Sequence, residues 1–355
     1  MLHAAPRPPY PTLAPSPARL ATAVDQLLRF IAADSTTGYE EPGVLAGLAI
    51  AAELGLPATR LEAGPGRDNL LIGHLKPAIL LCTHLDTVPP FIPGRLEREV
   101  VWGRGACDAK GVAIAMLHGL DLALDLLGRD TALSCLLVVG EESDHLGAKA
   151  IVASGCLTPR HILLGEPCGM TPAIGQKGLL KLRLLATGKS GHSAYPEVGS
   201  SAIHRLVDAL AAIVHAHWPS DPSLGDTTVN VGEISGGVAA NVIAASASAT
   251  VLFRCAAPVD AVLAALSDLL AASCPDVVAA ELSRSEPIDF DALGQKPGPA
   301  VPFNTDASYL LELGARVSLL GPGDMRCAHS EHEHLSVADL REGITRYAEA
   351  VVRLF

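Results

Sequence analysis

The sequence predicts an α/β protein with a mixed, largely parallel sheet flanked by helices, interrupted by a smaller inserted α+β domain. Three observations lead to this prediction: the length of 355 residues, short apolar runs that alternate with helical periods, and a change of that pattern near residue 173. One hydrophobic core usually stops growing at roughly 250–300 residues, so the length favours two domains. We therefore divide the chain into a Pro-rich N-terminal arm (1–18), a main domain (19–172 plus 284–355) and an insertion (173–283).

The main domain shows the alternation of strands and helices that is typical of a parallel sheet. Helical periodicity first runs through about 17–33 and 41–54. Short apolar runs then alternate with helix-like segments, the runs at 69–75, 79–83, 133–139 and 161–165 and the segments at 110–127 and 146–155. After the insertion we expect a helix at 305–313, a strand at 317–320 and a closing helix at 336–355. Such a sheet is covered by helices and binds ligands beyond the carboxyl ends of its strands.

The insertion has a different pattern. It begins with KGLLKLRLLATG, which alternates like a half-exposed antiparallel strand. We expect further elements in the order helix, strand, strand, helix, namely near 200–217, 227–234, 247–254 and 259–273. A strand-helix-strand-strand-helix-strand order suggests a compact, ferredoxin-like domain.

Composition excludes several classes of function. The net charge of −12, without a stripe of Lys and Arg, argues against nucleic-acid binding. No apolar run approaches the roughly 18 residues of a membrane helix, and the N-terminus lacks the basic and apolar regions of an export signal. Eight cysteines without a CxxC pair suit free thiols in a reducing compartment. We expect a cytoplasmic protein with small-molecule partners, no nucleic acid and no membrane.

Side chains that bind metals follow several of the apolar runs. They are His84 and Asp86 after ILLCT, Glu141 and Glu142 after LLVVG, Glu166 after HILLG, Asp108 after WGRGAC, and His329 after VSLLGPGDMRCA. An unpaired buried carboxylate costs several kcal/mol or shifts its pKa, and a divalent cation compensates that cost. This set of nitrogen and oxygen donors suits two zinc ions, with cobalt or manganese as substitutes. Two metals need a shared ligand, and Asp108 is our candidate.

The two adjacent glutamates are expected to have different roles. Neighbouring side chains at a strand end diverge, so Glu142 can bind metal while Glu141 stays free to transfer protons. Asp86 follows His84 by two residues, a spacing that lets its carboxylate accept the second imidazole N–H and fix the tautomer.

Several motifs together resemble one family of two-zinc enzymes. They are THLDTVP (83–89), GRGACDAKG (103–111), GEES (140–143), GEP (165–167), SGHSAYP (190–196), GPGD (321–324) and AHSEHEHL (328–335). In order and spacing they resemble the family of acetylornithine deacetylase, succinyl-diaminopimelate desuccinylase, aminoacylase and carboxypeptidases.

The resemblance implies a role for each candidate residue. The first zinc would be held by His84, Asp108 and Glu166, and the second by Asp108, Glu142 and His329. Glu141 would be the general acid/base and Asp86 the orienting carboxylate. The peptide bond after Asp108 would be cis without proline.

The insertion and the GPGD loop carry further candidates by resemblance. His192 would stabilise the oxyanion, often from the partner subunit of a homodimer formed through the insertion. Arg254, with Asn241 nearby, would hold the substrate carboxylate. Lys177 and Gly323 are candidate substrate contacts. Three of them have a structural alternative: a loop histidine for His192, a surface strand arginine for Arg254, and a plain turn for the loop of Gly323.

Three nearby histidines are interpreted as lying outside the site, and one alternative interpretation of a motif is rejected. His145 is expected in a solvated loop, and His332 and His334 compete with His329, although the preceding GPGD and Ala328 favour His329 as the ligand. The run GRGACD lacks the third glycine and the following strand and acid of a dinucleotide-binding loop.

The sequence thus predicts a metal-dependent amidohydrolase that removes an acyl group from an N-acylated amino acid. N-acetylornithine, a substrate of arginine biosynthesis, is the first choice, followed by N-acyl-lysine or a related blocked amino acid. One alternative is a two-zinc carboxypeptidase or dipeptidase. Another is a non-catalytic descendant that keeps metals for stability or dimerises through the insertion.

Overall fold

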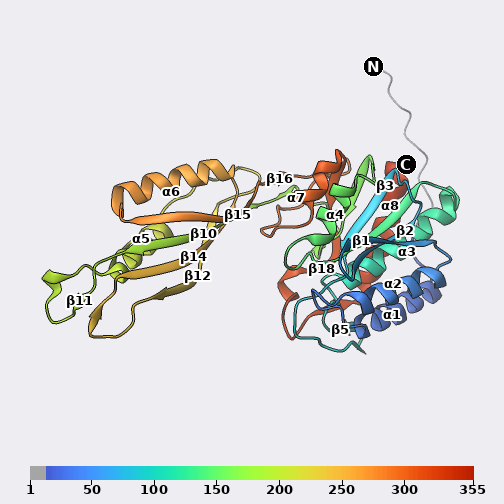
Figure 1. Ribbon diagram of the computed structural model, residues 1–355. Coiled ribbons are helices and arrows are strands. Elements are labelled where there is room, and N and C mark those ends of the chain that lie inside the picture. Colours follow the sequence, from blue (N-terminus) through green and yellow to red (C-terminus); the bar gives the residue numbers. More distant parts are fainter. Residues whose placement is uncertain (1–12) are drawn as a thin grey trace, which may run out of the picture. The chain divides into compact units, whose positions relative to one another are not determined.

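The computed structural model describes residues 13–355 and forms two compact units (Figure 1). The second unit comprises Ile174–Asp289 and Gly298–Asn304, and the other described residues belong to the first. The second unit extends past residue 283, the end of the insertion expected from the sequence. The reason is that β16 (Ile288–Asp289) pairs with β9 (Gly175–Gln176), so the two connecting segments run side by side. Residues 1–12 of the expected N-terminal arm lie outside the described residues.

Unit 1 is built on a six-stranded sheet with the order β1-β2-β6-β3-β7-β17. Its strands are β1 (Ala58–Gly64), β2 (Arg67–Gly73), β3 (Ile79–His84), β6 (Leu133–Val138), β7 (His161–Leu164) and β17 (Arg316–Leu319). Strands β6, β3, β7 and β17 are parallel, and β2 and β1 extend the sheet in antiparallel fashion. Every residue of β3, β6 and β7 is buried, which explains their continuous apolar runs. The predicted fold class is confirmed, with the half-exposed edge strand β1 as an addition.

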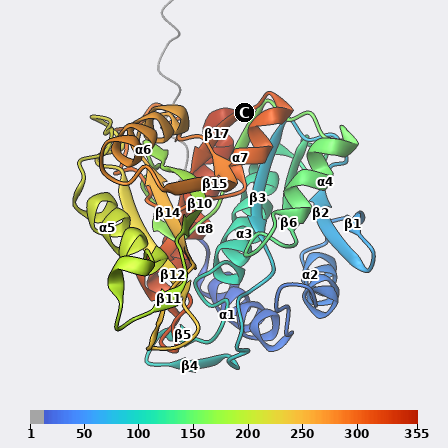
Figure 2. The same cartoon turned by 60° about the vertical axis from the view of Figure 1, so that its left-hand side comes forward.

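Helices surround this sheet (Figure 2). They are α1 (Pro17–Ala32), α2 (Glu41–Glu53), α3 (Lys110–Leu127), α4 (Leu146–Ser154), α7 (Ala307–Leu310) and α8 (Val337–Leu354). Helix α3 packs against α8 and α1, whereas α4 packs beside α7. The helix expected at 305–313 is only the short α7 and a 3₁₀ turn, and it ends at Gly314, which has a left-handed φ of 73°. None of the helices between residues 13 and 355 is both long and apolar enough to cross a membrane.

Short ribbons complete unit 1. They are β19-β5-β4, with β4 (Arg95–Glu97), β5 (Val100–Trp102) and β19 (His334–Ser336), and β18-β8, with β8 (Cys168–Gly169) and β18 (Gly321–Asp324). The first ribbon joins segments more than 200 residues apart, since His334 pairs with Trp102. It therefore fixes the chain shortly before the turn that carries Asp108 and shortly after the loop that carries His329.

Unit 2 has the predicted ferredoxin-like order of elements. They are β10 (Gly178–Thr187), α5 (Ala202–His215), β12 (Thr228–Gly236), β14 (Ser246–Cys255), α6 (Val259–Ser273) and β15 (Val277–Ser285). The strands form an antiparallel sheet with the order β12-β14-β10-β15. Alternate residues of β10 are buried in a core with the apolar sides of α5 and α6. A two-stranded ribbon of β11 (Gly191–His192) and β13 (Val242–Ile243) lies beyond one end of this sheet (Figure 1).

Candidate metal centre

The carboxyl ends of the parallel strands bring the candidate ligands of unit 1 to one edge of the sheet. His84 is the last residue of β3, and Glu166 comes two residues after the end of β7. Glu141 and Glu142 follow β6 after Gly140, whose φ of 77° turns the chain sharply. Because β3, β6 and β7 are parallel neighbours, these side chains meet at the place where such sheets bind ligands.

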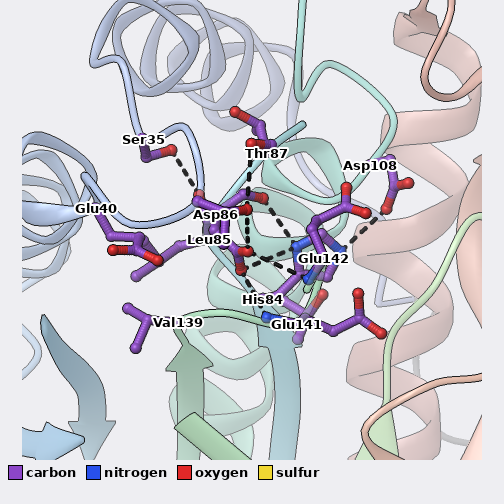
Figure 3. Close-up of polar contacts among 12 residues, drawn as sticks. Ser35, Glu40, His84, Leu85, Asp86, Thr87, Asp108, Val139, Glu141 and Glu142 are labelled. Carbon is purple, nitrogen blue, oxygen red and sulfur yellow. Dashed lines mark hydrogen bonds and ion pairs between the residues drawn. The ribbon is translucent and has the colours of Figure 1, made fainter. Parts of the chain in front are cut away.

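Asp108 lies in the turn between β5 and α3, and Figure 3 shows its contact with His84. Its Oδ1 is 3.0 Å from His84 Nε2, and its Oδ2 is 3.2 Å from His329 Nε2. The two oxygens of one buried carboxylate therefore face two different histidines. The peptide bond from Asp108 to Ala109 is cis, as the resemblance implied.

Two groups of potential ligands share this aspartate. One is His84, Asp108 and Glu166, and the other is Asp108, Glu142 and His329. Within each group, one donor atom from every residue lies within 4.8 Å of the others, and His329 Nε2 is 3.0 Å from the Glu142 carboxylate. Imidazole and carboxylate donors without a thiolate fit zinc, and also cobalt or manganese. The residues present therefore fit a pair of divalent cations.

The electrostatics of the cluster favour positive charge. Although burial opposes its ionisation, hydrogen bonds from His329 and His84 hold the pKa of Asp108 below its usual value. Hydrogen bonds to Asp108 and Glu142 raise the pKa of His329 to about 10. Protons on the histidines thus balance the carboxylates when no cation is bound. A cation that uses these nitrogens must displace those protons.

Asp86 has a second contact that its spacing from His84 did not reveal. His84 Nδ1 lies 2.9 Å from the backbone oxygen of Asp86 and 3.6 Å from its carboxylate, so the backbone makes the shorter contact. The carboxylate instead accepts the backbone N–H groups of Glu141 (3.2 Å) and Glu142 (3.3 Å), and the hydroxyl of Thr37 (2.8 Å) (Figure 3). Asp86 therefore holds the turn that carries both glutamates.

Glu141 belongs to neither ligand group. Burial, together with the nearby charge of Glu166, raises the pKa of Glu141 well above its ordinary value. A carboxyl group with a raised pKa, next to ligands that it does not join, is suited to taking up and releasing a proton.

His145 is not in a solvated loop, so that interpretation was wrong. Its side chain is 16% exposed, and its Nδ1 lies 2.9 Å from the buried Asp306 and 3.9 Å from Glu141. Its ring also packs against Tyr309 of α7. The sequence gives no sign of Asp306, because its partner His145 is 161 residues away and is brought near only by the packing of α4 beside α7.

The other two histidines of the HSEHEH segment lie outside the candidate groups formed by residues 13–355. His334 Nδ1 contacts the backbone oxygen of His332 at 2.7 Å, and its ring packs on Trp102. His329 is the one whose imidazole reaches the carboxylates. The geometry therefore favours His329 as the ligand.

In unit 2, His192 and Asn241 are close neighbours. His192 pairs with Val242 in the β11-β13 ribbon, and the backbone oxygen of Asn241 accepts the N–H of Ser193. His192 is exposed, and its Nδ1 accepts the N–H of Ala194 at 3.1 Å. This contact fixes the ring through Nδ1, so Nε2 is the nitrogen that can contact a substrate.

Arg254 and Lys177 lie at the other end of the same sheet. Arg254 pairs with Leu179 near the start of β10, and Lys177 directly precedes that strand. Partial burial lowers the pKa of Arg254 from its usual value. Lys177 Nζ donates to the backbone oxygen of Asp226. Within unit 2, the expected substrate contacts thus form two separate pairs, His192 with Asn241 and Arg254 with Lys177.

Gly323 lies in β18 of unit 1 and has a structural explanation. Its φ is +95°, and a Cβ there would lie 2.5 Å from the sulfur of Cys107, which precedes Asp108. The absence of a side chain makes room for the turn of Asp108. Contact with a substrate stays a prediction for this residue.

Comparisons with known proteins extend these observations. Residues 174–277 match the family model of the peptidase dimerisation domain, M20_dimer. A peptidase M20 domain-containing protein of Schizosaccharomyces pombe is 33% identical over 298 residues, 82% of this chain and 74% of that protein. A probable carboxypeptidase of Aspergillus terreus is 37% identical over 311 residues, 78% of this chain and 70% of the relative. A tripeptidase structure from Staphylococcus aureus, 19% identical, has a TM-score of 0.79 and covers 94% of this chain and 98% of its own, a likeness of fold.

Proposed function

Since the chain belongs to the M20 peptidase family, and is therefore a metal-dependent hydrolase of amide or peptide bonds, we propose that it is a two-zinc carboxypeptidase or dipeptidase. The similarity to a probable carboxypeptidase supports a peptide bond as the target. N-acetylornithine as the substrate and a role in arginine biosynthesis, the first choice from the sequence, are not confirmed. A non-catalytic descendant disagrees with the family and with the free carboxyl group of Glu141.

The position of Asp108 is the observation that carries this proposal. One carboxylate faces His84 with one oxygen and His329 with the other, so the two ligand groups share it. We propose that His84 and Glu166 complete the first site and that Glu142 and His329 complete the second. When bound, two zinc ions supply Lewis acidity, which polarises a carbonyl and lowers the pKa of water.

Glu141 is our candidate for the proton transfers. Its raised pKa lets the carboxylate accept a proton from the attacking water, and the resulting acid can deliver that proton to the leaving nitrogen. Asp86 supports this role by accepting the backbone N–H of Glu141, which fixes where the side chain begins.

Residues of unit 2 would recognise the substrate and the developing charge. Among residues 13–355, Arg254 has no acidic side chain as an ion-pair partner, and its guanidinium is partly buried. A free guanidinium suits the terminal carboxylate of a peptide. We assign His192 to the oxyanion of the tetrahedral intermediate, with Asn241 beside it.

A substrate panel tests the peptidase proposal against the deacylase alternative. Zinc- and cobalt-loaded protein is assayed with dipeptides, with the same dipeptides as C-terminal amides, and with N-acetylornithine and succinyl-diaminopimelate. We expect the highest kcat/KM for free dipeptides and a large loss for the amides. A kcat/KM that is higher for the N-acylated amino acids would assign the protein to the deacylases.

Substitution of Glu141 tests the mechanism separately. Glu141→Gln should bind zinc like the wild type but lose about 10²- to 10⁴-fold in kcat, because the amide cannot accept the proton. The same substitution at the exposed Glu62 of β1 serves as the control. If Glu141→Gln keeps its activity, another group is the base.

A further inference from the structure

We propose that Glu333 is a positioning residue of the metal centre, which holds the turn of Asp108 against the loop of His329. The inference rests on the proposed two-cation function. Glu333 lies between two histidines of the HSEHEH segment and is 1% exposed. It is not one of the candidate ligands.

The carboxylate of Glu333 organises the turn from within. Its Oε1 accepts the backbone N–H groups of Gly105 (2.8 Å), Cys107 (3.2 Å) and Asp108 (3.1 Å). The last of these is the N–H of the shared ligand itself. One oxygen thus gathers three donors within four residues, and the start of the Asp108 side chain is fixed by it.

The second oxygen connects this turn to the other loop. Arg104, 2% exposed, donates from Nη1 to Glu333 Oε2 at 2.6 Å and to the backbone oxygen of Ser330 at 3.3 Å. Ser330 directly follows His329. Arg104 therefore ties the chain that precedes Asp108 both to Glu333 and to the residue next to His329.

The backbone supports the same connection. Gly103 donates its N–H to the backbone oxygen of Glu333. This bond continues the pairing of β5 with β19 by one residue, since Trp102 pairs with His334. With the strands anchored, the Glu333 carboxylate and Arg104 set the remaining distance between the two loops. The spacing of Asp108 Oδ2 and His329 Nε2, 3.2 Å, depends on that distance.

A role in positioning differs from a role in folding alone by its effect on metal affinity. Glu333→Gln keeps the shape and one acceptor oxygen but places an amide against Arg104. Groups that orient metal ligands typically contribute 10- to 100-fold to metal affinity. We therefore expect Glu333→Gln to bind zinc about 10- to 100-fold more weakly than the wild type, measured by competition with a chelator on folded protein.

Asp121→Asn is the matched control. Asp121 of α3 is also a buried carboxylate paired with arginines, Arg19 and Arg129, but it lies eleven residues into the helix, roughly 16 Å from its start. We expect this variant to lose thermal stability in the metal-free form while its zinc affinity stays that of the wild type.

The outcomes separate the inference from the proposed function. Glu333→Gln with unchanged zinc affinity would overturn the positioning role, even if its metal-free form melts earlier. If that variant does not fold, Arg104→Lys, which keeps the charge but not the reach to Ser330, must show weakened binding; unchanged affinity there also refutes the inference. A wild-type protein that binds no zinc would overturn the proposed function, and the inference with it.

Discussion

Replacing Asp86 by Asn tests whether its carboxylate holds the turn of the two glutamates. The wild-type carboxylate has two acceptor oxygens, one for the N–H of Glu141 and the other for the N–H of Glu142 and the hydroxyl of Thr37. An amide of the same shape has one oxygen and one NH₂ group. In either orientation, one backbone N–H then faces a donor.

The expected magnitude follows from these contacts. A buried donor left without an acceptor costs about 1–3 kcal/mol. Because the turn is partly exposed, we expect Asp86→Asn to lower the free energy of unfolding by about 1–2 kcal/mol. The displaced turn also moves Glu141 and Glu142, so kcat/KM should fall about 10- to 100-fold. Thr37→Val removes only the hydroxyl contact and leaves both N–H groups paired. It should therefore cost less than Asp86→Asn in both measurements.

The assay needs a signal from unit 1 alone. The sequence has two tryptophans, Trp102 in unit 1 and Trp218 in unit 2, so a Trp218→Phe background reports the unfolding of unit 1 by fluorescence. Denaturant unfolding and kcat/KM are measured for Asp86→Asn and Thr37→Val in that background. If Asp86→Asn matches Thr37→Val in both, the carboxylate does not hold the turn.

Three further predictions follow from single contacts. His118 donates from Nε2 to Gln26, and burial lowers the pKa of its ring to about 4; since the unfolded value is about 6.5, stability should be full above pH 6.5 and fall by about 3 kcal/mol as the pH drops to 4. Unfolding at pH 4, 5 and 7 should show that slope in the wild type and not in His118→Gln. Gly323→Ala forces a Cβ against Cys107 at a φ of +95° and should cost about 1–2 kcal/mol, with partial rescue by Cys107→Ala; a melting temperature like that of the wild type would contradict this. His192→Ala should lower kcat about 10²-fold, and sedimentation should show a dimer, whereas a fully active monomer would exclude action across subunits.

Much of the site was predictable because its ligands follow local patterns. A buried parallel strand gives an uninterrupted apolar run, so a polar residue at its end is conspicuous, as with His84 and Glu166. Parallel topology then brings such ends together. The identity and approximate place of the ligands therefore need only the strands and their direction.

The supporting residues were not predictable in the same way. Glu333 lies in a segment of charged and polar residues that is typical of an exposed loop, and only the tertiary structure buries it under the turn of Asp108. The pairing of His145 with Asp306 depends on how α4 packs beside α7. Hydrogen bonds from side chains to distant backbone groups leave no periodic signal in the sequence. For the same reason, the backbone contacts of Asp86 were missed although its place beside His84 was not.

The register of the unit 2 sheet bears on how many subunits form one site. Arg254 lies near one end of β14, and the ribbon of His192 lies beyond the other end, which begins at Ser246. The eight residue-to-residue steps from Ser246 to Arg254 span roughly 27 Å of extended strand. A dipeptide is only about 7 Å long, so one copy of unit 2 cannot place both side chains on the same substrate. If both contact it, then Arg254 and His192 come from different copies of the chain. A mixed dimer of one subunit that lacks Arg254 and one subunit that lacks His192 should then keep one complete site and part of the activity.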